Sequence, residues 1–257
     1  MVRILVLAAL LLLASWWGQT ALTIAVAIVA VGAGLVMMKA GANRGSVGPL
    51  VVGVLAASYP TTASLLHYST GPGSSRLPGH LLLLSAGSLV VLTTIQVLHR
   101  QREAVVRLVS SGFFFVMYAG LPATFVIMIR AGAHGTRLLV TFVVILAAYL
   151  LGSRVAGKLL RSTSLRDRPP VVTWPVGLIG TLVASLGGFA VGAARVVPVS
   201  STSLLVIGAL VGITAVLGEV AATMMHNESS TSRSDSLLHI AVFSAPAFYY
   251  ALALYLV

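Results

Sequence analysis

The sequence predicts an all-α, polytopic integral membrane protein with about nine transmembrane helices and a cytoplasmic N-terminus. Of its 257 residues, 58% are hydrophobic and only 8% are charged, which is too few to coat a water-soluble globule. The apolar residues form runs close to the roughly 20 residues that a helix needs to cross the hydrocarbon layer. The basic residues are concentrated in alternate connections between these runs. Lipid is therefore the expected solvent for most of the chain.

The apolar runs mark nine expected spans, at residues 4–18, 21–38, 48–66, 81–98, 108–129, 138–153, 171–194, 197–218 and 237–257. The first run follows Arg3 and ends in Ser-Trp-Trp at residues 15–17, a poor match to the small-residue cleavage site of a signal peptide. We therefore expect it to remain as a span. We treat residues 1–257 as one transmembrane domain, with N-terminal helices in 1–130 and C-terminal helices in 131–257.

Three connections between the spans are rich in polar residues. Gly71–His80 reads as a turn-rich outer loop, and two inner connections are expected at residues 154–170 and 219–236. Binding and catalytic residues often lie in loops, and polar groups at a membrane surface need water or a partner. The two inner connections are therefore the expected location of a functional site.

The distribution of basic residues predicts the orientation. Twelve of the sixteen Lys and Arg residues fall on the inner side if the N-terminus is inside. The other four lie in outer connections: Arg76, Arg130, Arg137 and Arg195. Because cytoplasmic loops carry an excess of Lys and Arg, this count predicts a multi-pass protein of the cell membrane with cytoplasmic functional loops. A chain without a polar surface has no place for a duplex-sized basic face, so we expect no nucleic-acid binding.

Several chemistries are excluded or disfavoured. The chain has no cysteine, which excludes disulfides, thiolate metal sites and a cysteine nucleophile. Its histidines show no spacing typical of a zinc site, and no GxSxG nucleophile motif occurs. Arginine outnumbers lysine fourteen to two, as is typical of GC-rich bacterial genomes.

The acids suggest a metal site. Only five acids occur, and three of them lie in the second inner connection: Glu219, Glu228 and Asp235. Glu219 is expected to end span eight and Asp235 directly precedes span nine, so a short hairpin would bring their carboxylates together. Carboxylates are ligands that Mg²⁺ prefers. The alternative is that Asp235 and Ser236 cap the ninth helix while Glu219 pairs with an arginine.

The first inner connection supplies cations that suit phosphate groups. Arg154 and Lys158 begin a set that also includes Arg161, Arg166 and Arg168. Guanidinium and ammonium groups bind the phosphate oxygens of nucleotides and lipid headgroups. The alternative is that these residues only set the orientation of the helices.

Four patterns in the C-terminal half follow one another in order. They are ILAAYLLGSRVAGKLL at 145–160, RPPVVTWPVG at 168–177, Gly218-Glu219, and SRSDSLLHIAVFSAPAFYY at 232–250. Together they resemble motifs of the phosphatidate cytidylyltransferases, also called CDP-diacylglycerol synthases. Members of that family are polytopic membrane enzymes that join CTP to a lipid phosphate and release pyrophosphate.

The resemblance implies Mg²⁺-dependent transfer of CMP from CTP to phosphatidic acid or a related lipid phosphate, in phospholipid biosynthesis. The implied catalytic residues are Glu219, Asp235 and Arg233. The implied substrate and phosphate contacts are Arg154, Lys158, Thr173, Trp174, Tyr149 and Ser236. The implied Mg²⁺ ligands are Glu219 and Asp235, with Glu228 as a third carboxylate.

The sequence also departs from the family pattern. Ile145 replaces an Asp, Val171 and Val172 replace lysines, Ser232 replaces another Asp, and part of the pattern is missing between Glu219 and Ser232. Two hypotheses therefore remain open: a divergent enzyme, or a catalytically degenerate relative that binds anionic lipid as an accessory subunit of a membrane partner or of a homo-oligomer. A small transporter is less favoured because we expect no acid inside a span.

Overall fold

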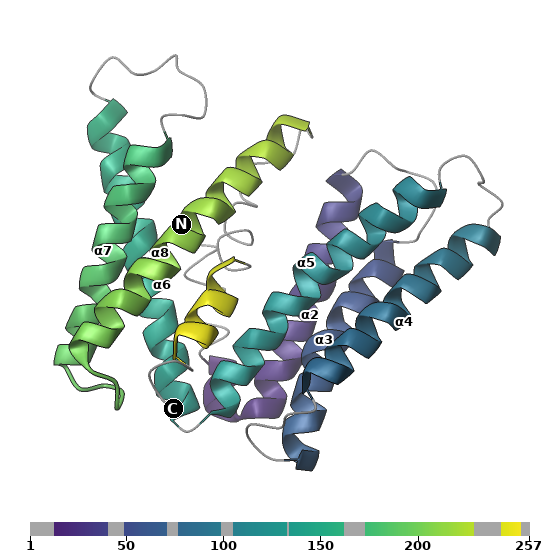
Figure 1. The fold of residues 1–257 in the computed structure, drawn as a ribbon, viewed down its shortest axis with the longest axis horizontal. Helices are drawn as coiled ribbons and strands as arrows, with labels where there is room; N and C mark the ends of the chain where they lie inside the picture. The colour runs from purple at the N-terminus through teal and green to yellow at the C-terminus, as the bar shows by residue number, and fades with distance from the viewer. Residues whose placement is uncertain are drawn as a thin grey trace. The chain divides into compact units, whose positions relative to one another are not determined.

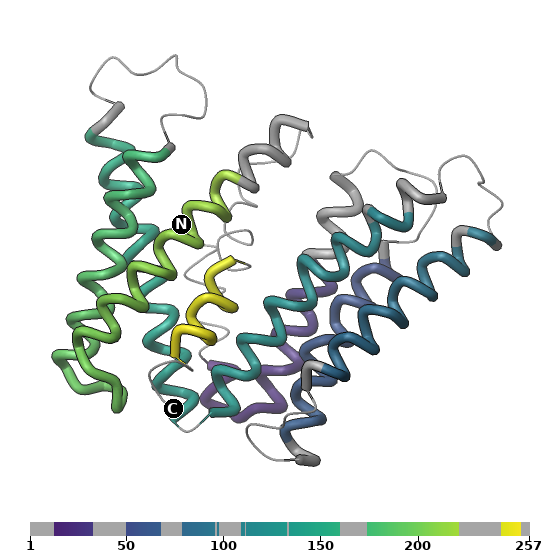
Figure 2. The backbone as a smooth tube through the Cα atoms, viewed as in Figure 1, coloured from purple at the N-terminus to yellow at the C-terminus, as the bar shows by residue number. Residues whose placement is uncertain are grey.

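The fold is helical throughout the residues that the structure describes. A computed structural model describes residues 13–40, 49–70, 77–98, 105–132, 134–161, 173–228 and 243–252, and these contain helices and turns but no strand. The helices with defined bounds are α2 (Gln19–Ala40), α3 (Pro49–Thr70), α4 (Leu77–Leu98), α5 (Val105–Ala131), α6 (Gly135–Arg161), α7 (Thr173–Ala193) and α8 (Ser201–Glu228). Helical segments also cover residues 13–17 and 243–252. Figure 1 shows the helices, and Figure 2 traces the same backbone as a tube.

Five helices are long and apolar enough to cross a membrane. Their apolar segments are Leu50–His67, Gly112–Ala131, Gly135–Leu159, Trp174–Ala193 and Ser201–Val220. These segments contain 18 to 25 residues, which matches a hydrocarbon layer about 30 Å thick. Large apolar side chains such as Leu82, Leu182 and Leu186 are exposed on the outside of the helices, where lipid rather than water suits them. The prediction of an all-helical, multi-pass membrane protein is confirmed.

Three helices are longer than hydropathy predicted. The expected loop Gly71–His80 is wrong at its end, because Leu77–His80 form the first turn of α4, where a proline is tolerated. The inner loops expected to start at residues 154 and 219 are wrong at their beginnings, because α6 continues to Arg161 and α8 continues to Glu228. Hydropathy marks apolar segments and not helix ends, and residues with a high helix preference, such as Ala, Leu, Met, Lys and Glu, can continue a helix beyond such a segment.

Glu219 consequently lies inside α8 and not at its end. Nine helical residues follow it, which places Glu228 about 14 Å further along the helix axis. The expected short hairpin from Glu219 to Asp235 therefore cannot begin at Glu219, because the helix continues beyond it. Asp235 itself lies outside the described residues. Glu219 is the second-to-last residue of the apolar segment Ser201–Val220, so it lies at the end of that segment although not at the end of the helix.

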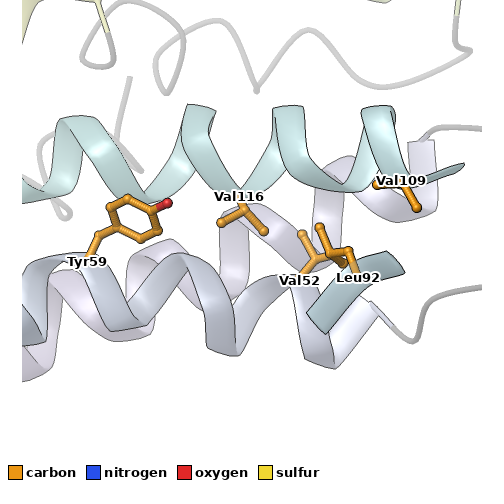
Figure 3. Packing of buried hydrophobic residues seen from close by; sticks show 5 residues of the cluster. All are labelled: Val52, Tyr59, Leu92, Val109 and Val116. Carbon is orange, nitrogen blue, oxygen red and sulfur yellow. The ribbon is translucent and has the colours of Figure 1, made fainter. Parts of the chain in front are cut away.

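The chain divides into two compact units, unit 1 (Met1–Gly132) and unit 2 (Ala133–Val257). In unit 1, α3 packs against α2 and α5, and α4 packs against α5. Side chains from these helices form a buried core, drawn in Figure 3, that consists of Val52, Tyr59, Leu92, Val109 and Val116. The Tyr59 hydroxyl donates to Ser85 Oγ and Met117 Sδ, each at 3.1 Å. Polar atoms inside a membrane protein need such internal partners because lipid offers none.

Arg130 also has a structural role in unit 1. Its Nε and Nη2 atoms donate to the Ser15 carbonyl oxygen, each at 3.3 Å. This contact joins the helical segment at residues 13–17 to the end of α5. One of the four cations predicted on the outer side is therefore used to hold two helices together.

In unit 2, α7 packs along both α6 and α8. Glycines four residues apart occur on each side of the α7–α8 contact, at Gly188 and Gly192 on α7 and at Gly208 and Gly212 on α8. A Cβ atom at Gly188 would overlap the Leu204 carbonyl oxygen, and one at Gly208 would lie 2.6 Å from the Ala184 carbonyl oxygen. The two backbones therefore touch, which is the packing that small residues permit between membrane helices.

The C-terminal helical segment joins this bundle through an aromatic contact. The ring centroids of Phe248 and Phe142 are 5.1 Å apart, and both side chains are buried. Residues 243–252 thus pack against α6 through this aromatic pair.

Candidate functional site

Tyr149 of α6 and Glu219 of α8 meet inside unit 2, although 70 residues separate them in the sequence. The Tyr149 side chain is fully buried. Its ring packs on α7 at Gly180, where an added Cβ atom would lie 2.9 Å from Tyr149 Cε2. Glu219 is partly buried, and its carboxyl group interacts with the Tyr149 hydroxyl. Two predicted site residues from different sequence patterns are therefore neighbours.

The Tyr149–Glu219 pair is a polar centre in an apolar bundle. The Tyr149 Oη atom is enclosed and has no hydrogen bond of standard length and angle. The Glu219 carboxyl is a polar neighbour of the phenol and acts on it electrostatically. Electrostatic interactions are stronger in such a low-dielectric interior than in water. An ionisable residue enclosed among apolar helices of a membrane protein commonly marks a functional site.

Arg154 and Lys158 lie on the last two turns of α6. They are four residues apart, so they share one face of the helix, and both side chains are exposed. Their positive charges are favourable near the C-terminal end of a helix and suit phosphate oxygens. These two predicted phosphate contacts therefore lie on one exposed face of α6.

The start of α7 follows the end of α6 and carries two further predicted contacts. Thr173 is the first residue of α7, although its side chain lies outside the described part. Trp174 is 52% exposed. Tryptophan is enriched at the interface between lipid and water, where one side of its ring is wet. This position suits contact with a lipid headgroup.

Part of the predicted site lies outside the described residues. Arg233, Asp235 and Ser236 belong to that part, and so does the side chain of Glu228, the last residue of α8. Among the side chains that the structure describes, no three His, Asp or Glu groups come together to hold a metal ion. Glu219 is the one predicted Mg²⁺ ligand whose surroundings are known, so the Mg²⁺ site stays a prediction.

Sequence reasoning did not predict the pairing of Tyr149 with Glu219. It assigned the two residues to separate patterns and placed Glu219 at a helix end. A signal was present, because Glu219 is the one acid between residues 173 and 220. An acid within such an apolar stretch needs a polar partner from a neighbouring helix.

Comparison with known proteins adds no further assignment: no family model matches the chain, and no curated protein matches it. The resemblance to the phosphatidate cytidylyltransferases therefore rests on the four sequence patterns. The meeting of Tyr149 with Glu219 is consistent with those patterns belonging to one site.

Proposed function

We propose that unit 2 is a divergent relative of the phosphatidate cytidylyltransferases that binds a lipid phosphate at the end of the bundle where α6 ends. The proposed reaction is transfer of CMP from CTP to phosphatidic acid or a related lipid phosphate. The observation that carries this proposal is the contact between Tyr149 and Glu219, because it joins two of the four sequence patterns. The exposed cations Arg154 and Lys158 on the following turns of α6 support phosphate binding.

The proposed reaction needs little proton transfer. An oxygen of the lipid phosphate attacks the α-phosphorus of CTP, the bond from that phosphorus to the bridging oxygen breaks, and pyrophosphate leaves. The attacking oxygen is already anionic, so no strong general base is required. The residues of the chain then have two tasks, which are to align the two phosphates and to neutralise their charge.

The predicted residues take different roles in this proposal. Arg154, Lys158 and Arg233 hold phosphate oxygens. Mg²⁺ would be held by Glu219 and Asp235, and when bound it would supply charge neutralisation on the triphosphate. Glu228 cannot share that ion with Glu219, because nine helical residues place it about 14 Å beyond Glu219 and on the opposite face of α8. Glu219 fits this role in its chemistry, since its carboxyl oxygens are ligands that Mg²⁺ prefers. Tyr149 is a positioning residue that supports the Glu219 carboxyl.

The proposed topology has nine spans with the N-terminus in the cytoplasm of a bacterial cell. It is supported by the excess of Lys and Arg in the inner connections. The end of α6, where Arg154 and Lys158 lie, would then face the cytoplasm, where CTP is available. The turn between α7 and α8 would lie on the outer side.

The second candidate is an accessory lipid-binding subunit without catalysis, acting with a membrane partner or a second copy of the chain. Ile145 favours it. This residue occupies the position of a family Asp, and its side chain is fully buried. An added Cβ atom at Gly188 would lie 3.6 Å from Ile145 Cδ1, so α7 packs directly on this side chain. A carboxylate needed for chemistry is therefore replaced by a core residue.

An activity assay with a binding assay tests both candidates. Purified protein in mixed micelles receives labelled CTP, Mg²⁺ and phosphatidic acid, and CDP-lipid is measured. Mg²⁺-dependent CDP-lipid above the background without protein supports the enzyme. Phosphatidic acid binding without CDP-lipid, weakened in an Arg154→Gln/Lys158→Gln variant, supports the accessory subunit. If the protein neither forms CDP-lipid nor shows such binding, both candidates are contradicted.

A further inference from the structure

Unit 2 has an open pocket at the end away from Arg154 and Lys158. Its volume is about 540 Å³, and it lies between the start of α6 and the turn that joins α7 to α8. The polar side chains that line it are His134, Arg137, Arg195, Ser200 and Ser201. None of its lining residues is an acid. The pocket is therefore a concentration of positive charge and hydrogen-bond donors.

The backbone at Arg195 turns its side chain toward this pocket. The amide of Arg195 donates to the Gly192 carbonyl oxygen at 2.9 Å, and the amide of Val196 donates to the Val191 carbonyl oxygen at 3.4 Å. This pair of bonds is a Schellman motif, whose left-handed residue is usually glycine. Here that residue is Arg195, with φ 52°. Arginine thus occupies a backbone position that residues other than glycine rarely adopt.

His134 adopts the same unusual conformation, with φ 61°, directly before α6. In the part of the chain that the structure describes, these two are the non-glycine residues with positive φ, and both line the pocket. Residues held in such conformations are concentrated at functional sites.

Two helices begin at the pocket. Gly135 starts α6 and Ser201 starts α8. Ser200 caps α8, since its Oγ atom accepts a hydrogen bond from the Ser203 amide at 3.0 Å. The first amides of each helix have no partner within their own helix, and the helix dipole adds positive potential. Backbone donors therefore support the side-chain cations at this place.

We propose that this pocket binds a phosphate group through Arg137 and Arg195, with His134 and the starts of α6 and α8 as additional donors. Two guanidinium groups suit a tetrahedral anion because each can donate two parallel hydrogen bonds. The phosphate is that of an anionic lipid headgroup or of a free ion. The site is separate from the proposed catalytic end, because Ser201 and Glu219 are about 27 Å apart along α8.

The charge distribution also favours binding over a role in orientation. In the proposed topology this pocket lies on the outer side, where cations oppose the positive-inside bias. Of the four outer arginines, Arg130 holds two helices together, whereas Arg137 and Arg195 converge on one pocket from distant parts of the sequence. A ligand gives a reason to keep these two charges there.

A local reporter tests this proposal. The chain has no cysteine, so a Thr202→Cys variant can be labelled with one fluorophore beside the pocket. The labelled protein is titrated with inorganic phosphate in neutral detergent, and is compared in phosphatidylcholine nanodiscs with and without phosphatidylglycerol. A response to phosphate identifies a free-ion site, and a response only to phosphatidylglycerol identifies a headgroup site. Both support the proposal.

Paired variants identify the residues responsible. Arg137→Gln/Arg195→Gln is expected to weaken the reporter response roughly 100-fold, about tenfold for each guanidinium. Arg154→Gln/Lys158→Gln removes the same charge from the other end of unit 2 and should leave the response unchanged. Absence of any response, or equal loss in both variants, would overturn the proposal. The reporter response does not depend on whether the protein forms CDP-lipid, so this proposal and the proposed enzyme activity can fail separately.

Discussion

Replacing Glu219 by glutamine is expected to lower CDP-lipid formation roughly 100- to 1,000-fold, the usual cost of losing one group that stabilises the transition state. Glutamine keeps the shape of the side chain beside Tyr149 but removes the charge that would hold Mg²⁺. The measurement is the initial rate with labelled CTP and phosphatidic acid. Binding of Mn²⁺ in place of Mg²⁺, followed by electron paramagnetic resonance, should be lost in parallel.

A charge-matched variant controls this experiment. Glu103 belongs to unit 1, and Glu103→Gln should leave both the rate and Mn²⁺ binding unchanged. A Glu219→Gln protein that keeps the full rate and binds Mn²⁺ normally would show that the carboxyl serves only as the buried partner of Tyr149. The Mg²⁺ assignment would then be wrong.

Replacing Gly188 by alanine is expected to destabilise unit 2 by about 1–3 kcal/mol, the usual cost of overpacking a tight contact. The added methyl group would overlap the Leu204 carbonyl oxygen, so α7 and α8 must move apart. Backbone atoms, unlike a flexible side chain, cannot rotate away. The measurement is the midpoint of thermal unfolding in detergent.

Gly157→Ala provides the matched control, because it makes the same chemical change on α6 with no atom within 4 Å of the new Cβ. Alanine favours a helix over glycine by about 0.5–1 kcal/mol, so this variant should unfold at the same or a higher temperature. Equal unfolding midpoints for both variants would contradict the close α7–α8 packing.

The sequence predicted the helical membrane fold because apolar runs of sufficient length have few alternatives in lipid. It predicted the helix ends less well. The apolar segment of α6 ends at Leu159 and that of α8 at Val220, and both helices continue past these residues because the residues that follow have an intrinsic helical preference. Hydropathy reports the surroundings of a residue and not its backbone conformation.

The candidate site was predictable only in part. The sequence identified Tyr149 and Glu219 separately, but their contact depends on how α6, α7 and α8 pack, with Gly180 allowing the Tyr149 ring to approach. The pocket at Arg137 and Arg195 was not predicted at all. Both residues were counted as outer cations, and their convergence depends on a turn in which arginine takes a position typical of glycine.

Labelling from the two sides of the membrane tests the central claim most directly, which is that unit 2 has a cytoplasmic lipid-phosphate end and an opposite outer end. Single cysteines are placed at Ser164, between α6 and α7 in the sequence, and at Thr202 in the first turn of α8. A membrane-impermeant maleimide is applied to intact cells and to inside-out vesicles. The account predicts that Thr202→Cys reacts only in intact cells and Ser164→Cys only in inside-out vesicles. Reaction of both cysteines from the same side would contradict it.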